Sequence, residues 1–121
     1  MLKDNLFKII NLKHGENTIH ASLELNKDNE ILKGHFPGQP VLPGACMVQI
    51  LKEVLEEAIE SDIRLKKADN IKFLNLIVPD DNNVLQLDLS YSFTGDKVIY
   101  VMASLTANAY ICFKFKGAFT V

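Results

Sequence analysis

Apolar and polar residues alternate along two stretches of the chain, which is the pattern of half-buried β-strands. The alternation is clearest over residues 85–93, in the sequence LQLDLSYSF, and it also runs over residues 18–26. Thr94-Gly95-Asp96-Lys97 then predicts a hairpin turn. Further strands are predicted over the apolar stretches 6–12, 71–78, 98–107 and 110–121. The sequence therefore predicts a largely antiparallel sheet.

One segment has the spacing of an amphipathic helix instead. Its apolar residues recur three and four positions apart, at Met47, Ile50, Leu51, Val54, Leu55, Ala58 and Ile59. Glutamates, Glu53 among them, fill the other side and predict a half-exposed C-terminal half. Gln49 is the single clearly polar residue of the first turns, which predicts an N-terminal half buried nearly all round. One helix followed by a run of antiparallel strands indicates an α+β fold, with a curved sheet around a single buried helix.

Composition and charge exclude several classes of function. A length of 121 residues suits a single domain, which we place at residues 1–121. A net charge of -2 offers no electrostatic attraction for nucleic acid or an anionic membrane, and no apolar run is long enough to span a bilayer. Cys46 and Cys112 stand in a chain without a secretory leader, so we expect reduced thiols and a cytoplasmic protein.

Residues 34–44 carry three prolines and three glycines, a density that no regular element tolerates, and they predict an irregular loop. With the start of the helix, this segment reads GHFPGQPVLPGACMVQIL and closely resembles the active-site segment of the 3-hydroxyacyl-[acyl-carrier-protein] dehydratases. A weaker resemblance continues over residues 68–81. The resemblance implies the hot-dog fold, in which an antiparallel sheet wraps around one central helix.

The resemblance also implies a function. Members of this family eliminate water from a 3-hydroxyacyl thioester to give the 2-enoyl thioester, in fatty acid or more specialised lipid and polyene synthesis. The substrate hangs from the phosphopantetheine arm of an acyl carrier protein, so we expect that carrier as a partner and neither a diffusible cofactor nor a metal. The family unit is a dimer, so we expect a homodimer or a trimer of dimers, or a pair with a dehydratase homologue.

His35 is the predicted catalytic base. An unionised imidazole suits proton removal at neutral pH, because its reference pKa is about 6.5. In the family this loop histidine faces the helix acid of the partner chain. Gly44 starts the helix, where free backbone N–H groups point outward and, by the resemblance, hold the thioester carbonyl. The resemblance also places Phe36 and Ala45 among the substrate contacts.

The family's catalytic Glu or Asp aligns with Gln49, and the Gln that the family tends to carry one turn later aligns with Glu53. A primary amide can orient a hydroxyl group but cannot deliver a proton. Three interpretations stay open. Glu53, which shares a helix face with Gln49, supplies the acid; or His35 performs both proton transfers; or the site binds acyl chains without fast turnover.

Two other classes of function also stay open. A catalytically weak, carrier-binding subunit of a heterodimeric dehydratase would account for Gln49. A hot-dog acyl thioesterase would need a carboxylate near the thioester, for which Glu53 is the candidate.

Four further residues are given structural roles. His14 and His20 lack the surrounding motif and are expected to be structural or solvated. Phe73 and Tyr100 are large and apolar, so we expect both in the core.

Overall fold

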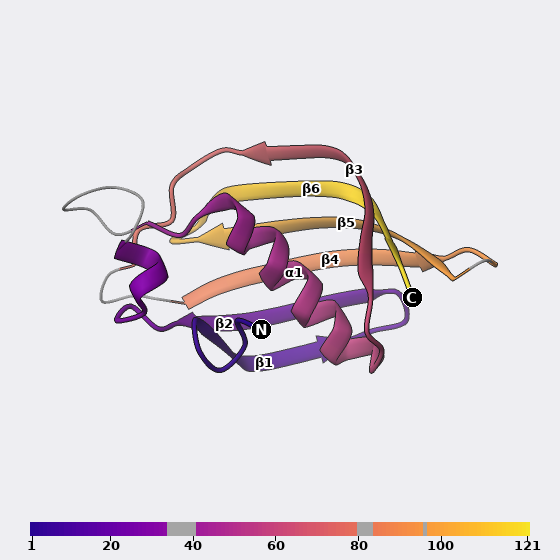
Figure 1. Cartoon of the computed structure of the whole chain (residues 1–121), viewed down its shortest axis with the longest axis horizontal. Coiled ribbons are helices and arrows are strands. Elements are labelled where there is room, and N and C mark those ends of the chain that lie inside the picture. Colours follow the sequence, from indigo (N-terminus) through magenta and orange to yellow (C-terminus); the bar gives the residue numbers. More distant parts are fainter. Residues whose placement is uncertain (34–40, 80–83, 96) are drawn as a thin grey trace.

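The structure is a computed structural model that describes residues 1–33, 41–79, 84–95 and 97–121 (Figure 1). Along the chain lie β1 (Phe7–His14), β2 (Thr18–Leu25), the 3₁₀ helix η1 (Glu30–Lys33), α1 (Gly44–Ile59), β3 (Arg64–Phe73), β4 (Val84–Phe93), β5 (Val98–Ala107) and β6 (Tyr110–Thr120). The predicted helix and the strands predicted at residues 6–12, 18–26, 85–93, 98–107 and 110–121 are confirmed, whereas the strand predicted at residues 71–78 overlaps β3 only over residues 71–73.

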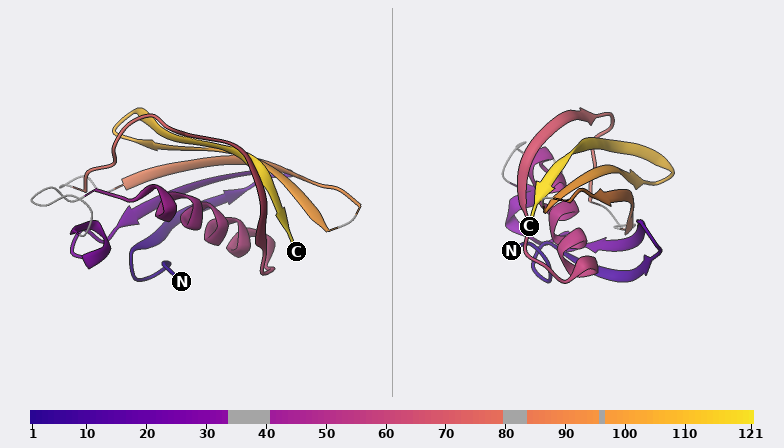
Figure 2. Two further views of the ribbon diagram at one scale, coloured as in Figure 1. Left: turned by 45° about the horizontal axis from the view of Figure 1, so that its top comes forward. Right: turned by 90° about the vertical axis from the view of Figure 1, so that its right-hand side faces the viewer.

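Within the described residues, the strands form one sheet in the order β1-β2-β4-β5-β6-β3, with every neighbouring pair antiparallel. Alternate side chains of β2, β4 and β5 are buried, because consecutive strand residues point to opposite faces. The sheet curves around α1, which lies across its inner face (Figures 1 and 2). The core between them includes Leu51 and Val54 of the helix with Leu87 and Phe113 of the sheet. This is the hot-dog fold that the resemblance implies.

β3 differs from the strand predicted at residues 71–78. It begins at Arg64 and ends at Phe73, in register with β6 from Thr120 to Phe113. The prediction missed residues 64–70 because most of them are polar, whereas backbone pairing with the long strand β6 defines the element. All ten residues of β3 are exposed, so no buried face imposes an apolar–polar alternation on its sequence.

Burial along α1 also differs from the prediction. Ala45 is exposed and Gln49 is half-buried, although the first turns were expected to be buried nearly all round. Glu53, expected on the exposed side, is only 1% exposed. The reason is that the sheet covers one side of the helix and the N-terminal segment contacts Glu53, while the outer side of the first turn stays uncovered in the described part of this single chain.

β3 is an edge strand of the sheet. Large apolar side chains on it and just after it are exposed, at Leu65, Ile71, Phe73, Leu74, Leu76 and Val78. Phe73 is 57% exposed and Tyr100 is 46% exposed, so the prediction that both lie in the core is wrong for the single chain. Proteins normally cover a long edge that carries exposed apolar side chains.

Candidate active site

The predicted site divides at the limit of the described residues. His35 and Phe36, the predicted base and a predicted substrate contact, lie outside the described residues, so their roles stay predictions. The other predicted site residues are all on α1: Gly44, Ala45, Gln49 and Glu53. The geometry of the site is therefore built from this helix.

α1 begins with free backbone donors. Pro43 takes the N-cap position with an extended backbone (φ -63°, ψ 147°) and makes no side-chain cap. Its carbonyl oxygen accepts from the N–H groups of Cys46 at 3.0 Å and Met47 at 3.3 Å. Among the described residues, the N–H groups of Gly44 and Ala45 have no acceptor. They lie at the positive end of the helix dipole, so this end of α1 can stabilise an oxyanion.

The ring of Phe73 packs against Gly44. A Cβ atom on Gly44 would come within 2.7 Å of two ring carbons of Phe73, closer than side chains pack. This contact therefore favours glycine at position 44 independently of any substrate. The sequence did not indicate the contact, because the two residues lie on separate elements and Phe73 was expected in the core. Since the Phe73 ring is mostly exposed, it has room to turn.

Gln49 and Glu53 meet on one face of α1, as their spacing predicts. The amide Nε2 of Gln49 donates to Oε2 of Glu53 at 2.7 Å. A carboxylate oxygen facing an amide fixes which end of that amide it meets, so the carbonyl Oε1 of Gln49 stays available as an acceptor. The resembled dehydratases carry an acid at the first of these positions and tend to carry a glutamine at the second. In this chain the amide and the carboxylate have exchanged positions and are hydrogen-bonded to each other.

Glu53 also anchors the N-terminal segment. Its Oε1 accepts the backbone N–H of Lys3 at 2.8 Å, and the N–H of Leu2 lies 3.0 and 2.9 Å from its two oxygens. A buried carboxylate requires such donors, because burying it unpaired would cost several kcal/mol or more. The expectation of an exposed glutamate is therefore wrong. Two of its partners are backbone N–H groups, which carry no sequence signal.

The other histidines are each held by a partner on the sheet. His14 Nε2 lies 2.6 Å from the hydroxyl of Tyr91, and His20 Nδ1 lies 2.6 Å from Oδ1 of Asp88.

Burial raises the pKa of the Cys46 thiol, which disfavours its nucleophilic thiolate. Within the described residues, no three His, Cys, Asp or Glu side chains gather to hold a metal ion, and no helix is long and apolar enough to cross a membrane.

Known proteins resemble this chain in sequence. The 3-hydroxyacyl-[acyl-carrier-protein] dehydratase FabZ of Wolbachia pipientis wMel is 33% identical over 80 residues, which are 60% of this chain and 56% of that protein. The FabZ of Enterococcus faecalis is 29% identical over 96 residues, which are 74% of this chain and 65% of that protein. The chain therefore spans less than two thirds of the length of each of these relatives.

Solved structures resemble it in fold. The dehydratase heterocomplex ApeI:P from Xenorhabdus doucetiae has a chain that matches with a TM-score of 0.74 at 18% identity, covering 93% of this chain and 96% of that one. A hypothetical thioesterase with coenzyme A from Streptococcus pneumoniae matches with a TM-score of 0.66 at 13% identity, covering 98% and 90%. At such identities these likenesses show the fold alone.

The family follows from the extent of a further match. The family model described as "ApeI-like: ApeI dehydratase" matches residues 11–113, which include the loop, α1 and most of the sheet. The chain belongs to the ApeI-like dehydratase family.

Proposed function

We propose that the protein removes water from a 3-hydroxyacyl thioester carried on the phosphopantetheine arm of an acyl carrier protein. The observation that carries the proposal is the start of α1. There, at the end of the motif of residues 34–44, the N–H groups of Gly44 and Ala45 lack acceptors among the described residues. The curated relatives, which are dehydratases of 3-hydroxyacyl groups on acyl carrier proteins, support this substrate class.

The reaction needs a base for a proton at C2 and a proton for the oxygen that leaves C3. His35 takes the C2 proton as the electron pair moves toward the thioester carbonyl, whose oxygen becomes negative. The N–H groups of Gly44 and Ala45 stabilise that oxygen, because donors placed where charge develops lower the barrier. The imidazolium of His35 then returns the proton to the C3 hydroxyl, the C3–O bond breaks, and water leaves beside the 2-enoyl thioester.

Gln49 orients the leaving hydroxyl in this scheme. Its Nε2 is committed to Glu53, and its Oε1 can accept from the O–H group on C3. Glu53 is the less favoured acid, because the N–H groups of Leu2 and Lys3 already occupy its oxygens. General acid assistance is commonly worth about 10²–10⁴-fold in rate, so we expect slower turnover than in a relative with a carboxylic acid at position 49.

The proposed site is completed by a second copy of the chain. Pairing of two β3 edges about a two-fold axis would continue the sheet and cover Ile71 and Phe73, which are exposed in the single chain. The partner's loop would then bring its histidine toward the start of α1. A dehydratase homologue is the second candidate partner, since one solved structural neighbour is a heterocomplex. Light scattering on the purified protein should give the mass of a dimer or a multiple of it; a monomer would contradict this step.

The activity is tested with purified protein and a 3-hydroxyacyl carrier protein, followed by intact-mass spectrometry. Loss of one water from the acyl carrier supports the proposal, and His35→Ala should abolish that loss. Release of free acid would instead identify a thioesterase. Binding without any mass change would identify a carrier-binding subunit, and the dehydratase proposal would then be rejected.

An exchange of Gln49 and Glu53 tests the roles within the pair. Gln49→Glu combined with Glu53→Gln restores the family's order and keeps an amide and a carboxyl group within hydrogen-bonding reach of each other. If the missing acid limits turnover, the double variant should be about 10²-fold faster. A double variant no faster than the natural sequence would show that His35 alone supplies proton transfer at full rate. Glu53→Gln by itself should leave the rate close to that of the natural sequence; a severe loss, in a variant that still folds, would restore Glu53 as the acid.

A catalytically weak subunit is the second candidate function. The observation that favours it is the amide at Gln49, which accepts and donates hydrogen bonds but delivers no proton. As such a subunit, the chain would bind the thioester with the N–H groups at the start of α1, and an active homologue would supply the proton transfer. Co-purification with that homologue should then raise activity well above the sum of the separate proteins.

A further inference from the structure

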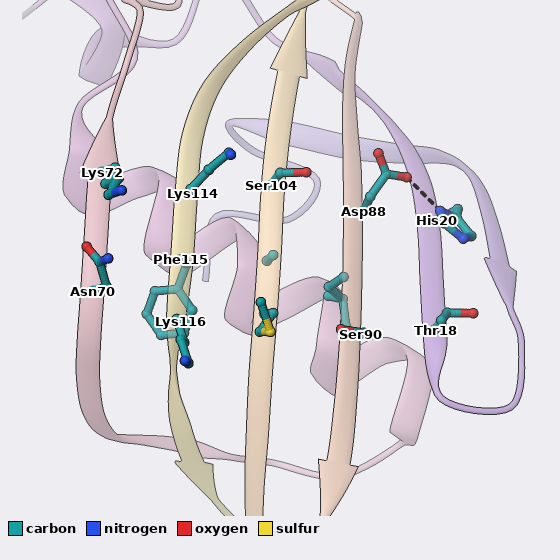
Figure 3. A pocket seen from close by; sticks show the side chains of 13 residues that line it. Thr18, His20, Asn70, Lys72, Asp88, Ser90, Ser104, Lys114, Phe115 and Lys116 are labelled. Carbon is teal, nitrogen blue, oxygen red and sulfur yellow. Dashed lines mark hydrogen bonds and ion pairs between the residues drawn. The ribbon is translucent and has the colours of Figure 1, made fainter.

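The face of the sheet that points away from α1 carries a shallow hollow of about 480 Å³ (Figure 3). Strand register aligns five polar side chains in one row across it, one from each of five neighbouring strands: His20, Asp88, Ser104, Lys114 and Lys72. A second row beside the first includes Met102 and Lys116. The hollow therefore extends over most of the width of the sheet.

One end of the hollow is cationic. Lys72 and Lys114 face each other across β3 and β6, and Lys116 lies two residues further along β6. No carboxylate of the described residues forms an ion pair with any of the three. Asp88, which also lines the hollow, is held by His20 at 2.6 Å. Like charges directly opposite each other destabilise a strand pair, so a partner that neutralises these lysines would offset that cost.

The dimensions of the hollow suit the face of a folded partner. At about 4.8 Å between strands, the row from His20 to Lys72 spans about 19 Å. Small-molecule sites, by contrast, enclose most of their ligand. Met102 lies beside the lysines and is 58% exposed, which adds an apolar contact of the kind that fills the middle of protein interfaces. The complementary partner is an acidic protein surface.

The cationic end lies across β3 from the candidate active site. Lys72 and Phe73 are consecutive, so their side chains point to opposite faces of the strand. Lys72 lines the hollow, whereas the ring of Phe73 packs against Gly44 at the start of α1. We infer that Lys72, Lys114 and Lys116 dock an acidic surface of the acyl carrier protein, whose arm then reaches the start of α1 around the end of β3. This inference rests on the proposed function, which requires a carrier.

Reversal of two charges tests the docking surface. Lys114→Glu combined with Lys116→Glu is compared with Lys8→Glu combined with Lys13→Glu, which makes the same change of net charge on exposed residues of β1. Each protein is assayed with a 3-hydroxyacyl carrier protein and with the same acyl group on free pantetheine. For the first variant, KM for the carrier substrate should rise about tenfold at low salt, while KM for the pantetheine substrate stays unchanged. The β1 variant should match the natural protein with both substrates.

Equal KM changes for the two substrates, or no change for the carrier, would overturn the inference. Fluorescence anisotropy of a labelled bacterial acyl carrier protein with the same variants needs no turnover. If carrier binding depends on Lys114 and Lys116 but no dehydration occurs, the docking surface is supported and the proposed function is rejected. Dehydration with carrier binding that the variant leaves intact would reject the docking surface and keep the proposed function.

Discussion

Glu53→Ala should destabilise the fold strongly, although the helical pattern placed Glu53 on the exposed side of α1. The substitution removes the acceptor of three donors, the N–H groups of Leu2 and Lys3 and the amide of Gln49. A buried donor left without a partner costs about 1–3 kcal/mol. Because all three donor residues are half-buried and water can reach part of them, we take about 1 kcal/mol each, or about 3 kcal/mol in total.

A loss of that size is large for a domain of this length. Small domains are stable by about 5–15 kcal/mol, and about 3 kcal/mol should lower Tm by about 10 °C. Urea denaturation followed by circular dichroism measures the change, with Glu57→Ala as the matched control. Glu57 lies one turn further along α1, and its one ion pair within the described residues is the exposed pair with the Lys3 ammonium at 2.9 Å. If Glu53→Ala unfolds no earlier than Glu57→Ala, the anchoring of the N-terminal segment by Glu53 is wrong.

Three further predictions test other parts of the structure. Gly117→Ala should lose about 1–3 kcal/mol of stability, because its Cβ would collide with the backbone oxygen of Lys67; Gly95→Ala, which has open space, should change the denaturation midpoint little. Ile71→Lys should lower the oligomer mass in light scattering without unfolding the chain, since it places a charge on the exposed edge of β3; an unchanged mass would show that this edge is not the interface. Burial raises the pKa of the Cys112 thiol more than the backbone of Ala107 lowers it. The folded chain then holds the thiol proton better than the unfolded chain, so stability should fall as pH rises past the ordinary value of about 9.0; a free energy of unfolding that rises there would contradict it.

Much of the fold could be predicted from the sequence because half-buried strands reveal themselves by alternation. β4 is the clearest case, since Leu85, Leu87, Leu89 and Tyr91 are buried in the core while the polar residues between them point to the other face. β3 could not be predicted in the same way. None of its residues is buried in the single chain, and backbone pairing with β6, which leaves no alternation in the sequence, defines the strand.

The candidate site was predictable to a similar extent. The loop motif and the start of α1 indicated Gly44 and its free donors, because proline followed by glycine marks a helix start from the backbone conformations that the two residues favour. The burial of Glu53 was not predictable, since the groups that stabilise it are backbone N–H donors far away in the sequence. The contact between Phe73 and Gly44 likewise depends on how the end of β3 meets the helix.

Dehydration at the start of α1 is tested most directly by the position at which labelled oxygen enters the acyl chain. A 2-enoyl carrier protein is incubated with the purified protein in water labelled with heavy oxygen, and the products are separated and fragmented. We expect label in a hydroxyl group on C3 of an intact thioester, because elimination of water is reversible through the same donors and the same base. Label in the carboxyl group of a released acid, or no incorporation by a folded dimer that binds the substrate, would contradict it.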